Sequence, residues 1–128
     1  MRAYLPISHI GLEQFIVAQS HEASRVFAPT SDFINENLDC DQEEIEYLLS
    51  TLAAEVALEM RATKEAPGLV LALELVEAQY GESHQDSMTL TSPVVWEQVQ
   101  CALLAHEDDD ELIWFATQEI SQEIDNWK

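Results

Sequence analysis

The sequence is poor in basic residues, and this scarcity limits the partners that it can bind. Of its 128 residues, five are Lys or Arg and 25 are Asp or Glu, which gives a formal net charge of −20. Proteins bind nucleic acids mainly through Lys and Arg side chains that neutralise phosphates. We therefore expect no direct contact with nucleic acid and none with a membrane, whereas a basic protein is a candidate partner.

Glycine, cysteine and long apolar runs are scarce as well. Three glycines form no phosphate-cradling loop, and Cys40 and Cys101 lack the Cys or His spacing of a zinc site. No stretch approaches the ~20 apolar residues that span a bilayer, and residues 1–19 lack the continuous apolar block of a signal peptide. These absences predict a cytoplasmic protein with free thiols and no cofactor.

Apolar residues are nevertheless plentiful enough for a core. They make up 47% of the chain and charged residues 23%, as in ordinary globular proteins. A chain of this length corresponds to one domain, so we expect residues 1–128 to fold as a single unit.

The clearest predicted element is a helix over residues 41–65. Its apolar residues recur at i, i+3, i+4 and i+7, which places them on one face. Asp41 and Glu44 have the spacing of a capping box at the start, and Pro67 with Gly68 would end the helix. Much of the acidity near its start, at Asp41, Glu43, Glu44 and Glu46, therefore has a local explanation.

The remaining predicted elements are shorter. We expect strands at the five ranges 2–8, 24–29, 69–75, 87–92 and 101–106. The first would lie near a sheet edge because it contains Pro6, the third would be central, and the fifth has a helix as its alternative.

Three helical segments complete the pattern. They are a short helix over 11–19, a helical turn or two over 93–100, and a final helix from Asp109, for which a strand through residues 112–115 is the alternative. Together these segments predict an α+β fold, in which helices pack on one face of a small sheet.

Several stretches resemble a family of short actinobacterial proteins grouped as a domain of unknown function. The opening "MRAYLP" resembles the family's Met-Arg-Val-Tyr-Leu-Pro, and "DQEEIEYLLSTLAAEVALEM" resembles its acidic run, Leu-Glu-Tyr and Ala- and Leu-rich helix. "ELIWFATQEI", residues 111–120, is similar to its closing Glu-Leu-Leu-Trp-Tyr-Ala-Thr-Gln-Glu-Leu. The chain departs from the family after the long helix, where "APGLVLALEL" lacks an Arg-Arg pair. The resemblance implies a shared fold and a cytoplasmic location, but no activity.

Five consecutive acids at residues 107–111 form the most conspicuous candidate site. A hard cation needs several converging oxygens, and adjacent carboxylates diverge; the D-x-D-x-D-G calcium motif is absent. The simplest interpretation is a solvated turn whose last acids cap a helix. A partner-binding patch and a metal site are the alternatives. The candidate partner contacts are Glu107, Asp108, Asp109, Asp110, Glu111 and Trp127.

The other reactive residue types form no catalytic motif. The four histidines, His9, His21, His84 and His106, lack HExxH spacing, and no G-x-S-x-G elbow is present. We therefore predict no catalytic, cofactor-binding or metal-binding residue.

The tryptophans near the C-terminus bear on packing and on oligomeric state. We expect Trp114 in the core. Trp127 lies one residue from the end and must pack either on its own domain or on a second copy, which makes a homodimer a candidate state.

These observations predict a non-catalytic, cytoplasmic protein-interaction or regulatory domain. Its contact surfaces would be the acidic faces around residues 36–46 and 107–111. One alternative is a DNA mimic that inhibits a nucleic-acid-binding protein. A second is a metal-assisted hydrolase that uses the acids with His106, and a third is that the charge serves only solubility or salt adaptation.

Overall fold

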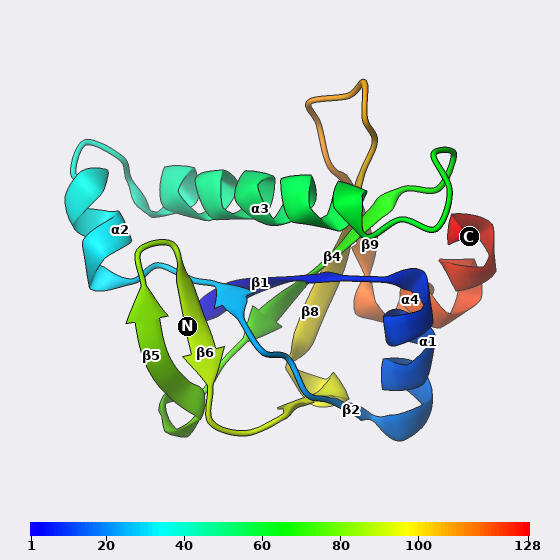
Figure 1. Ribbon diagram of the computed structural model, residues 1–128, viewed down its shortest axis with the longest axis horizontal. Coiled ribbons are helices and arrows are strands. Elements are labelled where there is room, and N and C mark those ends of the chain that lie inside the picture. The colour runs from blue at the N-terminus through cyan, green and yellow to red at the C-terminus, as the bar shows by residue number, and fades with distance from the viewer.

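A seven-stranded antiparallel sheet forms the centre of the computed structural model, which describes residues 1–128 (Figure 1). The strand order is β5-β6-β3-β1-β4-β8-β9. The bounds of these strands in chain order are β1 (Arg2–Ile7), β3 (Val26–Phe27), β4 (Gly68–Glu74), β5 (Tyr80–His84), β6 (Ser87–Leu90), β8 (Val99–Ala105) and β9 (Ile113–Ala116). A separate two-stranded sheet pairs β2 (Ser20–His21) with β7 (Val94–Val95).

Four α-helices and three 3₁₀ turns accompany the sheet. They are α1 (His9–Ala18), α2 (Ser31–Glu36), α3 (Gln42–Glu59), α4 (Thr117–Glu123), η1 (Glu77–Gln79), η2 (Trp96–Gln98) and η3 (Ile124–Trp127). This combination of one antiparallel sheet with helices confirms the predicted α+β class.

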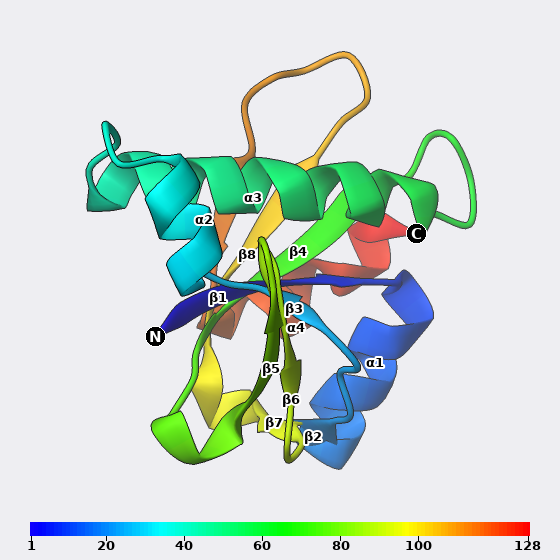
Figure 2. The same ribbon diagram turned by 60° about the vertical axis from the view of Figure 1, so that its left-hand side comes forward.

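Helices cover both faces of the sheet, where the sequence predicted one covered face (Figure 2). The two faces are set by strand alternation. In β4, Val70 and Ala72 pack with α3, whereas Leu69, Leu71 and Leu73 join the core beneath α1, α4 and η3. A strand that is apolar on both sides is typical of a sheet covered twice.

Strand β1 is central, so the predicted edge position is wrong. It lies between β3 and β4, and its whole length from Arg2 to Ile7 pairs with β4. Pro6 is tolerated because β3 is only two residues long and pairs with β1 at Tyr4 alone. The side of β1 next to Pro6 therefore has no strand that needs a backbone donor there.

Helix α3 begins where the sequence predicted and ends earlier. Asp41 Oδ1 accepts a hydrogen bond from Glu44 N at 2.9 Å, and Glu44 Oε1 accepts one from Asp41 N at 3.2 Å, which confirms the capping box. The last helical residue is Glu59. Arg61 then turns back and donates from Nε to Leu58 O at 2.8 Å, so the connection that follows is held by a side chain rather than by further helix.

Two predicted helical segments fold differently. Of the helical turn or two predicted over residues 93–100, the 3₁₀ turn η2 is present, and it follows strand β7 instead of beginning at Pro93. Residues 113–116 form β9, as in the strand alternative, and the helix begins only at Thr117. The reason is tertiary: Ile113 pairs with Leu104 and Ala116 with Cys101 of β8, and this ladder overrides the helical spacing of the apolar residues.

Candidate interaction surface and buried polar groups

The acidic run lies in the loop that joins β8 to β9, residues 106–112. This loop projects past α3, away from the sheet (Figure 1). The expectation that its acids cap a helix is wrong, because the next element is a strand and α4 starts six residues after the last of them, at Thr117. The electrostatics of a helix terminus therefore do not explain the run.

Few contacts neutralise the loop. Asp109 Oδ1 accepts a hydrogen bond from Glu111 N at 3.0 Å, which shapes the turn. Arg61 Nη2 lies 3.4 Å from Glu107 Oε2, the one ion pair that the run makes. All five acids are exposed. The result is a group of like charges that repel one another and remain open to solvent.

Exposed apolar side chains follow the loop directly. Ile113 is 45% exposed and Trp114 is 60% exposed. The prediction that Trp114 belongs to the core is wrong, because β9 is the outermost strand while α3 packs mainly over β1 and β4. A large exposed aromatic ring beside a charged loop is a composition found at protein interfaces.

The second acidic region, residues 36–46, differs from the loop. Asp41 and Glu44 are engaged in the capping box, and Glu43 lies in the first turn of α3, near the positive end of the helix dipole. Beyond this region, Glu55 and Glu59 are exposed along α3. Much of the acidity near residue 41 therefore stabilises α3, whereas the loop acids contribute to no helix.

The histidines lie on separate elements, and two of them, His9 and His21, have structural roles. His9 Nε2 is 2.7 Å from Ile124 O and its Nδ1 is 3.1 Å from Glu13, so it joins α1 to the C-terminal turn. The ring of His21 stacks on Phe15 at 5.4 Å, and burial lowers the pKa of His21. No group of three or more His, Cys, Asp or Glu is placed to hold a metal ion, so the geometry gives no support to a metal-assisted hydrolase.

Both cysteines are free thiols. Burial raises the pKa of Cys101, which lies under α3. Partial burial, followed by the charges of Asp39, Glu44 and Asp41, raises the pKa of Cys40. A raised pKa keeps a thiol protonated at neutral pH, so neither side chain resembles an activated nucleophile.

Trp127 packs on its own domain. It is 3% exposed, and its ring meets that of Phe115 edge to face with centroids 5.1 Å apart. Its surroundings are the core beneath α1, α4 and η3. This packing explains the position of a tryptophan near the C-terminus without a second copy of the chain, and it leaves little of the ring for a partner.

Two features of the site could not be read from the sequence. Arg2 lines a cavity and its Nε atom is buried without a hydrogen-bond partner. The exposure of Trp114 depends on the edge position of β9. Neither feature has a local sequence signal, because each follows from the order of strands and from elements distant along the chain.

Comparison with known proteins defines the family. Residues 1–109 match the model of a family described as "Family of unknown function (DUF6912)", so the chain belongs to this family. The matched region ends within the acidic loop, and β9 and α4 lie beyond it. No curated protein matches the chain, and neither does any solved structure. None of the helices combines the length and the apolar character that crossing a bilayer requires.

Proposed function

We propose that this protein is a non-catalytic interaction domain that binds a basic partner protein through the 106–112 loop and strand β9. One observation carries the proposal: five exposed carboxylates project past α3, and one of them, Glu107, is ion-paired. A loop of seven residues is longer than most hairpin connections, which need two to five. Conspicuous surface loops on a rigid sheet often carry binding residues.

Charge and apolar area would have separate roles in such an interface. The carboxylates attract a basic surface and accelerate its encounter, an effect that salt weakens. Trp114 and Ile113 supply exposed apolar area next to the charge, and tryptophan is common among residues that dominate binding energy. A second copy of this chain would present the same negative loop, so the surface favours a different protein.

The cytoplasm is the compartment that we propose for this contact. Two free thiols, one of them buried, suit a reducing environment. The negative charge also argues against direct contact with nucleic acid, whose phosphates it would repel.

Matched charge variants test the proposal. We expect wild-type protein, immobilised at low salt, to capture a basic protein from lysate and to release it at moderate salt. The loop variant Asp108→Asn/Asp110→Asn/Glu111→Gln should lose this capture. The control variant Glu77→Gln/Glu82→Gln/Glu97→Gln has the same net charge but changes exposed acids elsewhere, and it should retain it. Equal capture by both variants would show that total charge, rather than the loop, is responsible.

A DNA mimic is a sharper version of the same idea, and one observation favours it. Exposed acids recur along α3 at Glu43, Glu44, Glu55 and Glu59, and a helix of this length extends roughly 27 Å. The loop adds further carboxylates beside the C-terminal half of α3. If the captured partner binds nucleic acid, duplex DNA should displace this protein from it; a partner that binds both at once would rule out mimicry.

A further inference from the structure

A cavity is lined by residues from the start of β1, from α2 and from the first turns of α3. These three elements lie close together in Figure 2. The volume of the cavity is about 390 Å³, within the range typical of small-molecule sites. Pro29, Ile34 and Ile45 give it apolar walls, and Arg2 and Glu46 bring opposite charges to its lining. Such a site can bind the apolar part of a ligand and can also interact with charged groups on the same ligand.

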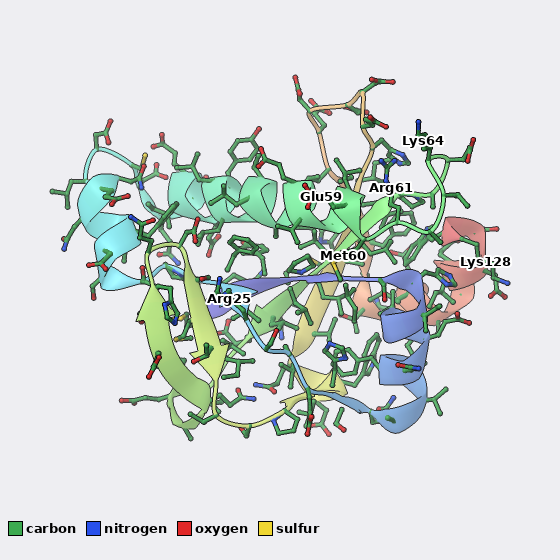
Figure 3. All side chains as sticks on the ribbon, viewed as in Figure 1. Arg25, Glu59, Met60, Arg61, Lys64 and Lys128 are labelled. Atoms are coloured by element: carbon green, nitrogen blue, oxygen red, sulfur yellow. The ribbon has the colours of Figure 1, made fainter.

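Arg2 is unusual among the five basic side chains. The side chains of Arg2, Arg25 and Lys64 form no ion pair and no hydrogen bond, and of these three only Arg2 has an atom, Nε, that is buried without a partner. Arg61 provides a contrast, since it donates to three carbonyl oxygens and contacts Glu107 (Figure 3). A buried donor left without an acceptor is destabilising and rare in folded proteins, so its presence calls for an explanation.

Glu46 is the free carboxylate of the same cavity. Asp41 also lines it, but its carboxylate already accepts a hydrogen bond in the capping box of α3. Glu46 forms no ion pair with Arg2; Arg2 extends from β1 and Glu46 from α3. Both charges nevertheless act on the hydroxyl of Tyr4: burial is the main cause that raises the pKa of Tyr4, Glu46 raises it further, and Arg2 lowers it.

A simple ion can pair with only one of the two unpaired groups, Arg2 or Glu46, that line the cavity. A small anion would be attracted to Arg2 but repelled by Glu46. A small cation would be attracted to Glu46 but repelled by Arg2. A zwitterion satisfies both, because its carboxylate can pair with a guanidinium while its ammonium pairs with a carboxylate. The apolar walls add a preference for an uncharged hydrocarbon side chain.

We propose that this cavity binds a free α-amino acid with an apolar side chain. Its carboxylate accepts hydrogen bonds from Arg2, its ammonium group donates to Glu46, and its side chain contacts Ile34 and Ile45. This site is separate from the 106–112 loop, so it goes beyond the interaction function and does not depend on it.

Calorimetric titration of the full chain with L-leucine, L-isoleucine, L-valine and L-methionine tests the proposal. We expect at least one of them to bind at millimolar concentration. The same ligand without its ammonium group (4-methylpentanoate for leucine) or without its carboxylate (3-methylbutylamine) should bind at least about tenfold more weakly. These comparisons use wild-type protein, so they do not depend on the folding of any variant. Absence of binding by all four amino acids, or equal binding by the truncated analogues, would overturn the proposal.

Substitutions test whether Arg2 and Glu46 bind the two charged groups of the amino acid. Arg2→Gln and Glu46→Gln should each weaken binding about tenfold or more, and Arg2→Lys should weaken it less than Arg2→Gln because it keeps the charge but not the planar fork. Arg25→Gln and Glu55→Gln are matched controls, since both residues are exposed and lie outside the cavity. Unchanged binding in Arg2→Gln would overturn the assignment.

Discussion

The two faces of the sheet are covered in different ways. Beneath α1, α4 and η3, large side chains such as Phe15, Ile120 and Trp127 join a cluster of 19 buried residues. Above the other face, α3 contributes mainly small residues, including Ala53 and Ala57, to a cluster of 11 that Phe33 of α2 also joins. The first face therefore buries more apolar surface and should contribute more to stability.

The small residues of α3 allow a close approach that has its own consequences. A Cβ atom added at Gly68 would lie 2.9 Å from Leu58 N, so the end of α3 rests almost directly on β4. The same side of the sheet also carries the ionisable groups Tyr4 and Cys101. The comparison shows that the α1 face provides the main apolar core. The α3 face has a smaller core, and it carries Tyr4 and Cys101.

The largest expected effect is on the α1 face. Phe15 is fully buried between the ring of His21 and that of Trp96, whose centroid is 5.1 Å away. Phe15→Ala should lower the free energy of unfolding by about 3–5 kcal/mol, measured by urea denaturation. Ile10→Ala, on the same helix at a side chain that is 66% exposed, should change it by less than about 0.5 kcal/mol. Similar losses in both variants would mean that this face is not the main core.

A pH effect is expected on the α3 face. Burial, and then the charge of Glu46, raises the pKa of Tyr4 from 10.0 to about 12, so folding favours the protonated hydroxyl. This contribution is complete below pH 10 and is lost as the pH rises through 12. The expected loss is about 2–3 kcal/mol.

Substitution identifies the source of that pH effect. In Tyr4→Phe, the free energy of unfolding measured between pH 9 and pH 12 should lack this part of the pH dependence. Tyr47→Phe, which removes an exposed hydroxyl from α3, should behave as wild type. Parallel curves for wild type and Tyr4→Phe would refute the assignment.

A smaller effect separates the two acidic regions. Asp41→Ala removes the side chain that accepts a hydrogen bond from Glu44 N, and it should destabilise the protein by about 1 kcal/mol. Asp39→Ala removes an equal charge two residues away, at a residue outside the cap, and is the matched control. Equal effects of the two substitutions on thermal unfolding would show that charge, rather than capping, explains the acidity at this end of α3.

The smallest effect on stability is expected at the loop. Asp108→Asn/Asp110→Asn/Glu111→Gln should change the free energy of unfolding by no more than about 0.5 kcal/mol, and in the stabilising direction, because it relieves repulsion without removing a cap. The gain should shrink as salt is added. A marked destabilisation would indicate that the loop acids have a structural role, and it would weaken the interaction proposal.

The sequence predicted those elements whose cause is local. The capping box at Asp41 and the apolar spacing that follows it define α3 within one stretch of chain. The continuous apolar run of β4 likewise identified a central strand. Strand β9 was harder, since Ile113, Ala116 and Ile120 fit a helix equally well until their pairing with β8 is known.

The features of the candidate site also differ in whether their cause is local in the sequence. The acids at residues 107–111 are adjacent in the sequence and could be found there, although their position in a hairpin loop could not. The cavity between Arg2 and Glu46 joins a strand to a helix far along the chain, so no spacing rule reveals it. The exposure of Trp114 depends on which strand lies last in the sheet.

The contacts of Arg61 differ in length, and this difference affects how firmly each one joins the turn after α3 to its neighbours. Its hydrogen bonds to Leu58 O and Lys64 O hold the turn after α3 to itself at 2.8 and 2.9 Å. Its contact with Glu107 is longer, at 3.4 Å, and joins that turn to the hairpin. A competing cation would break the long contact first. We therefore expect added salt to loosen the contact between the hairpin and the turn after α3 before it disturbs the hydrogen bonds within that turn.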